Sequence, residues 1–419
     1  MAAALRPESL LTPPPPPARD ADALAPAHWG FADTRFTLRP DGAVVLTGGR
    51  YALSGLELPE LLPWTERVMG VSLPRQESPE LRTTPPIPPA RPCAAFRAAA
   101  TERLGAEHVS DADHLRLRHG HGQTLEEMYR VKRDGLGRIP DLVCFPASEH
   151  EVAALLELAR QHQICLIPYG GGTNVTDALR CPVDEPRPIV SVDLARMNRI
   201  RWVDRVNQMA CIEAGAVGRH IQQQLAALGF TLGHEPDSVE FSTLGGWIAT
   251  HASGMKKNRY GNIEDIVLDV HAVTPAGALT RASVVPRESV GVDARRWMLG
   301  SEGTLGIITH AVVRVFPLPE VTRHDAILFD SFETGFEFLR LLTRRGQLPA
   351  SVRLVDNLQF QLSQTLKPRA EGAAALKRQL ERWVVTRVRG FDPQKMVACT
   401  IVFEGTHDEV KRQQRIVQE

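Results

Sequence analysis

The feature that most constrains this chain of 419 residues is a run of three glycines at residues 170–172, shortly after an apolar stretch. The stretch Ile164-Cys165-Leu166-Ile167 is typical of a buried strand. Consecutive glycines let the following backbone adopt positive φ and approach a ligand closely. Thr173 and Asn174 add side-chain donors, and N–H groups in such a turn form an anion-binding nest. The run fits neither G-x-x-x-x-G-K-[ST] nor G-x-G-x-x-G, so it predicts either a tight turn or a phosphate-binding loop of another kind.

The composition argues against several classes of protein. Lys and Arg together number 49, as do Asp and Glu, so no overall field attracts nucleic acid or an anionic membrane. Aromatic residues make up only 6%, too few for platforms on which bases stack. No apolar run approaches the ~18 residues that a membrane-spanning helix needs. The six cysteines lack C-x-x-C spacing, which predicts reduced cysteines of an intracellular protein. No metal site is predicted, because His119 and His121 have no third ligand at metal-binding spacing.

Four regions are predicted along the chain. Residues 1–26, with five consecutive prolines, bury too little apolar surface to fold and predict a disordered leader. Residues 27–133 predict a mostly helical N-terminal region. Residues 134–318 form the predicted binding domain, and residues 319–419 begin a further domain. The helical pattern near the end contains no Gly or Pro to close it, so this last domain is expected to be cut.

Within the N-terminal region, a hairpin is predicted from strands 36–38 and 44–46, which flank a Pro-Asp-Gly turn. A short helix after Pro59 and further helices at 94–104 and 124–133 complete this region.

From residue 139 the pattern alternates between strands and helices. A strand at 142–145 is followed by Ser148-Glu149-His150-Glu151, an S-x-x-E capping box, and by a helix with Val152 and Leu155 on one face. The strand at 164–167 completes a β-α-β unit. Later segments predict strands at 189–192, 209–213 and 326–329, and helices at 218–228, 335–343 and 373–388. This alternation predicts an α+β or α/β domain.

Four glycine-rich or polar turns lie within the predicted binding domain. They are residues 168–174, 236–246, 250–254 and 300–306. Together they indicate an extended cofactor with a pyrophosphate and a flat ring, although glycines also serve tight turns in β-rich domains.

Several motifs resemble a known family. Pro140-Asp141-Leu142-Val143, P-x-G-G-G-T at 168–173 and G-x-E-G-T-L-G at 300–306 resemble the FAD-binding domain of the vanillyl-alcohol oxidase superfamily. Within it, Glu240-Phe241-Ser242-Thr243 and Ser253-Gly254-Met255-Lys256-Lys257-Asn258 resemble the alkyldihydroxyacetonephosphate synthase family, also called alkylglycerone-phosphate synthases. The resemblance runs from about residue 29 to the end of the chain.

The resemblance implies an α+β fold: a two-subdomain FAD-binding domain with a helical N-terminal region and a truncated α+β cap. It implies FAD as cofactor and a transferase of ether-lipid synthesis. Such a flavoenzyme exchanges the acyl chain of acyl-dihydroxyacetone phosphate for a long-chain fatty alcohol, with no net redox change. In the family's mechanism, flavin N5 bonds to the substrate carbon as the fatty acid leaves, and the alcohol then displaces the flavin. A peroxisomal location and a homodimer are further expectations, and the long-chain substrates suggest peripheral membrane contact.

Carried over by motif, the residues expected to contact FAD come from the four turns. They are Pro168, Tyr169, Gly170, Gly171, Gly172, Thr173, Asn174, Asp237, Ser238, Val239, Glu240, Phe241, Ser242, Thr243, Thr250, His251, Ala252, Ser253, Glu302, Gly303, Thr304, Leu305, Gly306, Ile307 and Ile308. Arg353 matches a family arginine near the active site, although an Arg close to Asp356 also fits a structural ion pair.

The sequence departs from the family in three ways. The family's phosphate-binding arginine, acid/base tyrosine and histidine-rich loop lie beyond the point matching Glu419, so this chain is not expected to complete catalysis alone. The family usually has Arg where this sequence has His251, which either weakens FAD binding or exchanges one donor for another. The cleavable peroxisomal signal of animal members precedes the point that matches the start of this chain.

Two other functions stay open. One is an FAD-dependent oxidase or dehydrogenase of 2-hydroxy acids, and the other is a catalytically inactive FAD-binding chain. Two smaller features also have two interpretations. His234 beside Glu235 predicts a hydrogen-bonded pair or a functional histidine, and Lys256 and Lys257 fit either a phosphate contact or a solvated turn.

Overall fold

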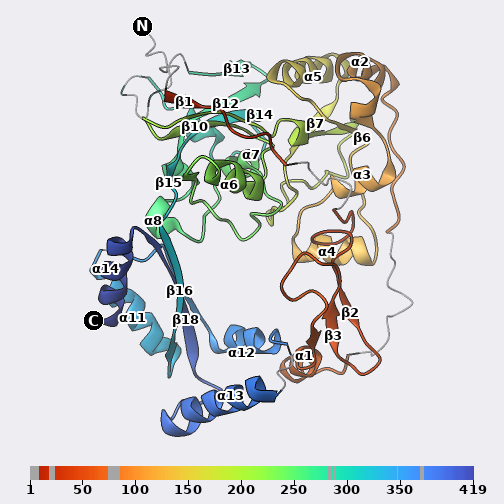
Figure 1. Cartoon of the computed structure of the whole chain (residues 1–419). Helices are drawn as coiled ribbons and strands as arrows, with labels where there is room; N and C mark the ends of the chain where they lie inside the picture. Colours follow the sequence, from red (N-terminus) through yellow and green to blue (C-terminus); the bar gives the residue numbers. More distant parts are fainter. Residues whose placement is uncertain are drawn as a thin grey trace. The chain divides into compact units, whose positions relative to one another are not determined.

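A computed structural model describes residues 9–17, 24–73, 85–281, 285, 289, 291–346, 348–368 and 372–419. The predicted leader lies partly outside these residues, at 1–8 and 18–23. The chain divides into two compact units (Figure 1). The first contains residues 1–29 and 82–318, and the second contains residues 30–81 and 319–419. The predicted N-terminal region, 27–133, is therefore shared between the two units.

The first unit contains a four-stranded sheet in the order β5-β6-β8-β7. Its strands are Val109–Ser110, Leu142–Cys144, Ile189–Asp193 and Cys165–Tyr169. β6 and β7 are joined by helix α5 (Glu149–His162), and each pairs in parallel with β8, which lies between them. The predicted β-α-β unit is present, but a later strand separates its two strands. Every residue of β6 and β8 is buried, and apart from Ser191 and Asp193 all are apolar, as expected for parallel strands covered on both faces.

A second sheet of the first unit has six strands in the order β1-β9-β10-β14-β12-β13, all paired antiparallel. They are Leu10–Leu11, Ile200–Asp204, Met209–Glu213, Ile307–Arg314, Val267–Thr274 and Gly277–Leu279. The strand β1 lies in the stretch predicted to be disordered, so that prediction is wrong for Leu10 and Leu11. The physical reason is that β9 would otherwise be an edge strand, and β1 satisfies its exposed N–H and C=O groups.

Helices and short turns cover these sheets. They are α2 (Ala94–Leu104), η3 (Ala106–His108), α3 (Asp113–Arg118), α4 (Leu125–Lys132), η4 (Leu194–Arg196), α6 (Gly218–Ala226), α7 (Leu244–Ala249), α8 (Lys257–Tyr260), α9 (Ile263–Ile266) and α10 (Arg295–Met298), with a two-stranded ribbon of β11 (Phe230–Thr231) and β15 (Phe316–Pro317). The predicted capping box before α5 is half formed. Ser148 accepts a hydrogen bond from the Glu151 N–H, but the Glu151 carboxylate accepts from Ala147 N–H instead of Ser148.

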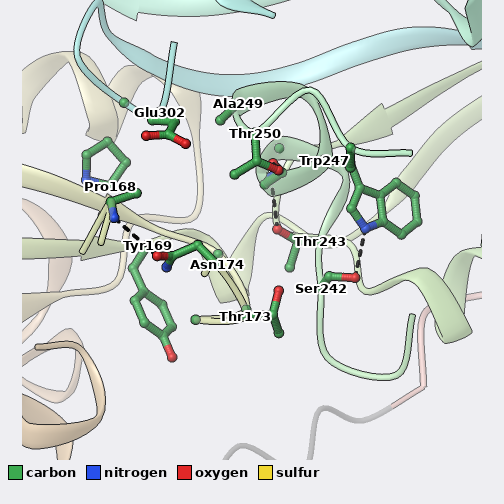
Figure 2. Close-up of a pocket in the computed structure, with 18 of the residues that line it drawn as sticks. Pro168, Tyr169, Thr173, Asn174, Ser242, Thr243, Trp247, Ala249, Thr250 and Glu302 are labelled. Carbon is green, nitrogen blue, oxygen red and sulfur yellow. Dashed lines mark hydrogen bonds between the residues drawn. The ribbon is translucent and has the colours of Figure 1, made fainter. Parts of the chain in front are cut away.

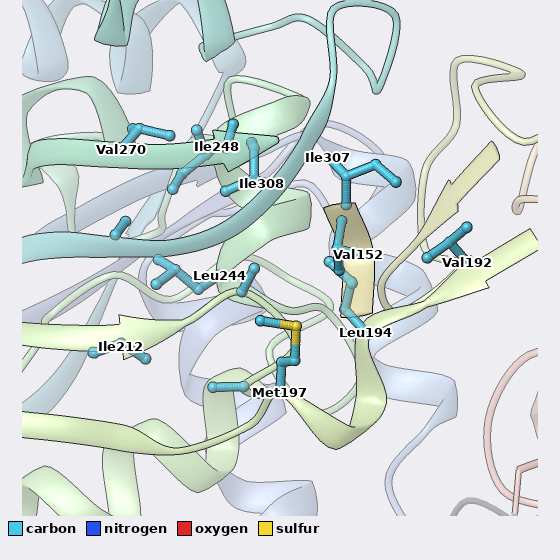
Figure 3. Packing of buried hydrophobic residues seen from close by; sticks show 14 of the residues in the cluster. Val152, Val192, Leu194, Met197, Ile212, Leu244, Ile248, Val270, Ile307 and Ile308 are labelled. Carbon is cyan, nitrogen blue, oxygen red and sulfur yellow. The ribbon is translucent and has the colours of Figure 1, made fainter. Parts of the chain in front are cut away.

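One continuous hydrophobic core joins both sheets of the first unit. Val152 of α5, Val192 of β8, Ile212 of β10 and Ile307 of β14 all belong to this core, and each is less than 4% exposed. Figure 3 shows these side chains between the strands and helices that carry them. The core fixes the loops that leave the ends of these strands.

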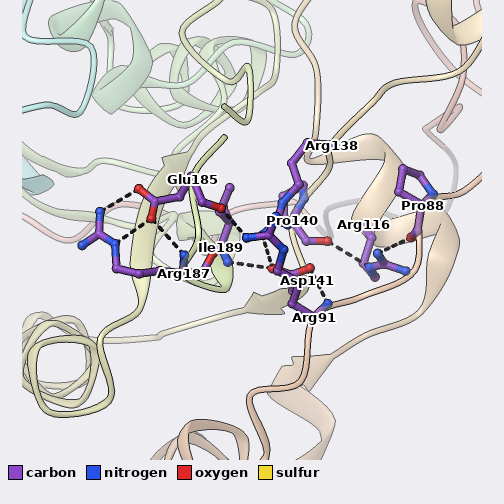
Figure 4. A network of polar contacts seen from close by, with 9 residues as sticks. All are labelled: Pro88, Arg91, Arg116, Arg138, Pro140, Asp141, Glu185, Arg187 and Ile189. Atoms are coloured by element: carbon purple, nitrogen blue, oxygen red, sulfur yellow. Dashed lines mark hydrogen bonds and ion pairs between the residues drawn. The ribbon is translucent and has the colours of Figure 1, made fainter. Parts of the chain in front are cut away.

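A buried carboxylate ties together three segments of the first unit (Figure 4). Asp141 is 2% exposed and accepts hydrogen bonds of 2.8 Å from Arg138 Nη2, from the Ile189 N–H and from the Arg91 N–H. Such charge-assisted bonds offset the cost of burying the carboxylate. Arg116 donates in the same region to the carbonyl oxygens of Pro140 and Pro88. The Pro-Asp motif noted in the sequence thus has a structural role.

The second unit contains two three-stranded sheets and several helices. The sheet β2-β3-β4 is built from Phe36–Leu38, Val44–Leu46 and Glu57–Leu58, and its first two strands form the predicted hairpin, with Phe36 opposite Leu46. The sheet β16-β18-β17 is built from Val321–Phe329, Val397–Gly405 and Ser351–Val355, all antiparallel. The helices are α1 (Leu61–Met69), α11 (Phe332–Arg344), α12 (Asn357–Thr365), α13 (Gly372–Trp383), which continues into the π-helical turn η5 (Val384–Val388), and α14 (His407–Gln418).

Side chains hold this unit together. Trp64 Nε1 of α1 donates to Gln361 Oε1 of α12 at 3.2 Å. Cys399, Ile401 and Phe403 of β18 pack with Val410 of α14. Among the helices that the structure describes, none is long and apolar enough to cross a membrane.

Candidate functional site

A cavity of about 300 Å³ lies in the first unit, where loops from both of its larger sheets converge. Its walls come from the loop after β7, the turn before α7, α7 itself and the loop before β14. Figure 2 shows residues of these four segments around one space. The size is at the lower end of the range of ligand pockets, roughly 300–1,000 Å³.

The first wall is the glycine triplet. Gly172 has φ of 67°, a left-handed conformation that favours glycine. Gly171 packs against the Phe241 carbonyl oxygen so closely that an added Cβ would overlap it. Among the described residues, no acceptor takes a hydrogen bond from the N–H groups of Gly171, Gly172 and Thr173. Unpaired N–H groups that line a cavity are suited to an anion such as a pyrophosphate.

The second wall is a set of hydroxyl groups held by the α7 helix. Trp247 Nε1 donates to Ser242 Oγ at 2.7 Å, and Ser242 Oγ donates to the Ser238 carbonyl oxygen at 2.9 Å. Thr243 is the N-cap of α7 and accepts a hydrogen bond from the Gly246 N–H. Ser238 Oγ lies 3.5 Å from Thr173 Oγ1, which brings this wall to the glycine loop.

The third wall carries the pocket's charge. Among the described residues that line the cavity, Glu302 is the only one with a charged side chain. Its backbone is left-handed, with φ of 47°, and its N–H donates to the Ala249 carbonyl oxygen at 2.9 Å. Its carboxylate accepts a hydrogen bond of 2.8 Å from Thr176 Oγ1, on the segment that follows the glycine loop. Two walls of the cavity are thereby linked through one side chain.

Most of the predicted contact residues line this cavity. They are Pro168, Tyr169, Gly170, Gly171, Gly172, Thr173, Asn174, Ser238, Ser242, Thr243, Thr250, Ala252, Glu302, Gly303, Gly306 and Ile308. The other predicted contacts lie in the same four turns, or at the start of β14 in the case of Ile307, but outside the described lining: Asp237, Val239, Glu240, Phe241, His251, Ser253, Thr304, Leu305 and Ile307.

Sequence reasoning missed part of the lining. Trp247 and Ala249 lie on α7, Leu179 and Leu194 supply apolar surface, and Thr176 anchors Glu302. Trp247 and Leu194 are buried core residues as well, so their sequence pattern carries a packing signal and no ligand signal.

Two predicted residues lie elsewhere. His251 has φ of 53°, and its Nε2 lies 3.3 Å from a Glu264 carboxylate oxygen. Arg353 lies on β17 of the second unit, where it is exposed. Asp356, its suggested ion-pair partner, caps α12 by accepting a hydrogen bond of 2.7 Å from the Gln359 N–H.

The predicted hydrogen-bonded pair of His234 and Glu235 is not formed. His234 is 1% exposed, packs edge-on against Trp247 at 4.9 Å, and has no hydrogen-bond partner for either ring nitrogen among the described residues. Burial lowers the pKa of His234 to about 4, because the charged imidazolium would lose its hydration. Glu235 instead pairs with Lys256, whose Nζ lies 2.7 Å from Glu235 Oε1.

All six cysteines are free thiols. Burial raises the pKa of each, to about 12 for Cys144, Cys181 and Cys211 and to about 11 for Cys399. The pKa values of Cys93 and Cys165 are also raised, again mainly by burial. Such thiols are poor nucleophiles at neutral pH.

The donors fit a flavin dinucleotide. Unpaired N–H groups and hydroxyls from Gly171 to Thr243 suit the pyrophosphate, and Leu179, Leu194 and Ile308 offer apolar surface to a flat ring. A fold with this pocket between the four-stranded and six-stranded sheets of one unit is that of an FAD-binding protein of the vanillyl-alcohol oxidase type.

Comparisons with known proteins agree with this class. A family model described as "FAD binding domain" matches residues 140–283, and one described as "FAD linked oxidases, C-terminal domain" matches residues 318–419. A relative from Caenorhabditis elegans named alkyldihydroxyacetonephosphate synthase is 40% identical over 91% of this chain, and one of the same name from Dictyostelium discoideum is 33% identical over 93%. A solved structure of an alkyldihydroxyacetonephosphate synthase covers 95% of this chain with a TM-score of 0.84 and 32% identity, and 71% of that chain is covered.

The chain belongs to the alkyldihydroxyacetonephosphate synthase family, and its cofactor is FAD. It spans 64% and 65% of the length of the two curated relatives.

Proposed function

We propose that the chain belongs to an enzyme that makes an ether lipid precursor from acyl-dihydroxyacetone phosphate and a long-chain fatty alcohol. The observation that carries the proposal is the 40% identity over 91% of the chain to the C. elegans relative, whose name states this synthase activity. The pocket supports it, because its unpaired N–H groups and hydroxyl side chains suit FAD.

The reaction is a balanced exchange. The C–O bond between the dihydroxyacetone carbon and the ester oxygen breaks, and the fatty acid leaves as a carboxylate with both of its oxygens. The alcohol oxygen bonds to that carbon and loses its proton, so no electrons are gained or lost. FAD, when bound, supplies the nucleophilic ring nitrogen for this exchange.

The residues of this chain hold the cofactor and exclude water from it. Gly171 to Thr173 bind the pyrophosphate through their N–H groups, and Ser238 and Thr243 add hydroxyl donors. Trp247 orients Ser242 through their hydrogen bond. Arg353 is proposed as an active-site arginine, so an Arg353→Lys variant should slow the bleaching of the flavin by acyl-dihydroxyacetone phosphate while FAD binding stays unchanged.

The test is the visible absorption spectrum of the purified chain before and after anaerobic addition of acyl-dihydroxyacetone phosphate. Flavin bands that bleach support the proposal, because they would show that the flavin reacts even without the family residues expected beyond Glu419. Flavin bands that stay unchanged after the substrate is added would identify an FAD-binding chain without activity. Reduction of the flavin by D-lactate or glycolate would instead favour a 2-hydroxy-acid oxidase or dehydrogenase.

Peripheral membrane contact is a second part of the proposal, and helix α13 supports it. Leu376, Leu380 and Trp383 are each more than half exposed, and Lys377 and Arg382 lie on the same helix. An amphipathic helix with Leu and Trp on one face and basic residues on the other binds anionic bilayers. The chain should co-sediment with vesicles that contain anionic lipid, and a Leu380→Glu/Trp383→Glu variant should not. Absence of the unmodified chain from the pellet would remove this part.

A homodimer and a peroxisomal location complete the proposal, and both rest on the family alone. Light scattering of the purified chain would give its oligomeric state. Imaging of a tagged full-length protein would test its location.

A further inference from the structure

We propose that residues 24–29 form a strap that holds the FAD pocket closed, and that Trp29 is its positioning residue. The inference rests on FAD binding to the pocket described above. The strap belongs to the first unit, as do all the described residues that line the pocket.

One end of the strap contacts the turn before α7. The ring of Trp29 lies edge-on against Phe241, with 5.1 Å between ring centroids and 75° between ring planes. Phe241 is 8% exposed, whereas Trp29 is 45% exposed. The indole therefore covers Phe241 from outside, and edge-to-face aromatic pairs of this kind contribute beyond their buried area.

Phe241 joins two walls of the pocket. Its N–H donates to the Ser238 carbonyl oxygen at 2.9 Å, which shapes the turn that carries the hydroxyl groups. Its own carbonyl oxygen is the atom against which Gly171 packs. A displacement of Phe241 would move both the hydroxyl wall and the glycine wall.

The other end of the strap is linked to the glycine loop through residues 121–123. His121 Nε2 lies 3.1 Å from the Pro26 carbonyl oxygen, and His121 Nδ1 lies 2.7 Å from the Gly122 carbonyl oxygen. His121 is 4% exposed, so these contacts are shielded from water. The next residue, Gln123, donates its N–H to the Asn174 carbonyl oxygen at 2.8 Å, at the end of the glycine loop. Residues 24–29 thus connect both walls without lining the cavity themselves.

A strap of this kind acts on the rate at which the cofactor leaves. FAD buried among loops departs when those loops open locally, and a contact that must break first slows that opening. It also holds the loops in their bound arrangement, which lowers the ordering cost of binding. Trp29 should therefore affect FAD retention more than overall stability.

The experiment compares three variants of the full FAD-loaded chain: Trp29→Ala, Trp29→Phe and the matched control Trp297→Ala. Trp297 is another exposed tryptophan of the first unit, 59% exposed and outside the described lining of the pocket. FAD release after dilution is followed by the rise in fluorescence of free flavin. The visible circular dichroism of bound flavin reports the geometry of the pocket, and urea unfolding of the FAD-free chains reports stability.

We expect Trp29→Ala to release FAD at least fivefold faster than the unmodified chain and to change the flavin dichroism. Trp29→Phe keeps an aromatic edge on Phe241 and should stay within twofold, as should Trp297→Ala. Equal release rates for Trp29→Ala and Trp297→Ala would overturn the strap. So would a faster release from Trp29→Ala that is fully accounted for by a lower stability of its FAD-free chain. If Trp29→Ala does not fold, Trp29→Leu carries the same test. An unmodified chain that binds no FAD would overturn the cofactor assignment itself, and the strap with it.

Discussion

At the scale of single residues, the pocket binds an anionic cofactor with dipoles and carries one negative charge. The N–H groups of Gly171 to Thr173 and the hydroxyls around Ser242 supply the favourable field. Glu302 opposes it, although its carboxylate also links two walls through Thr176. A Gln at this position would keep the link to Thr176 and remove the charge, because a carboxamide oxygen accepts the same hydrogen bond.

A Glu302→Gln variant should therefore bind FAD as tightly as the unmodified chain or up to about tenfold more tightly. Removing a like charge about 4 Å from a phosphate relieves about 1 kcal/mol of repulsion at a water-like dielectric constant near 80. Isothermal titration of the FAD-free chain measures the effect, and a Glu302→Ala variant serves as control because it also loses the Thr176 link. Weaker binding by Glu302→Gln than by Glu302→Ala would contradict this account.

His234 gives the first unit a built-in acid sensitivity. Burial lowers its pKa from 6.5 to about 4, so between these values the unfolded chain binds a proton that the folded chain does not. Stability therefore falls as the pH drops through this window, and above pH 6.5 the group has no effect. The loss should reach about 2 kcal/mol at pH 5.

Urea unfolding at pH 7 and pH 5 measures this loss. His234→Phe keeps a ring against Trp247 and cannot be protonated, so the drop between the two pH values should shrink by that amount. The buried His310, whose pKa is lowered to about 3 mainly by burial, is present in both chains and cancels in the comparison. An unchanged drop in the variant would show that His234 is not the group responsible.

At the scale of elements, helix α5 depends on one cap. Ser148 accepts the Glu151 N–H, and the buried face of Val152, Leu155 and Ala159 packs into the core. A Ser148→Ala variant should lose about 1 kcal/mol of stability, the usual cost of a lost N-cap. Chemical denaturation measures it, with the exposed, non-capping Ser363→Ala of α12 as control. A loss no larger than that of the control would mean that the Glu151 bond to Ala147 suffices for the turn.

Elements defined by local patterns were predictable from the sequence. The hairpin at Phe36–Leu38 and Val44–Leu46, helix α2 and strand β10 have the expected bounds, because period and turn residues specify them locally. The pairing of β1 with β9 and the insertion of β8 between β6 and β7 join segments far apart in sequence, which no local pattern records. The glycine loops of the site were predictable because positive φ at Gly172 and close backbone packing at Gly171 require glycine. Trp247 and Leu194 were not, because an apolar residue that lines a pocket looks like one that fills a core.

At the scale of the whole molecule, the two units have separate cores, and every described residue of the FAD pocket belongs to the first. FAD should therefore protect the first unit selectively. At 100 times its dissociation constant the cofactor adds about 2.7 kcal/mol to the stability of the state that binds it. Amide hydrogen exchange in β7, β10 and β14 should be slower with FAD than without it, and the exchange rates in β16 to β18 should change little. Equal slowing in both units would show that they unfold as one.

The shielded thiols have a practical consequence for labelling. With all six pKa values raised, few thiolates exist at neutral pH, and a maleimide dye attacks only the thiolate. A cysteine introduced at an exposed position, such as Val183 in the first unit or Leu376 in the second, would be the preferred target without removal of any native one. One dye can therefore be attached to each unit with the native cysteines in place. Energy transfer between the two dyes would then follow the separation of the units as substrate is added.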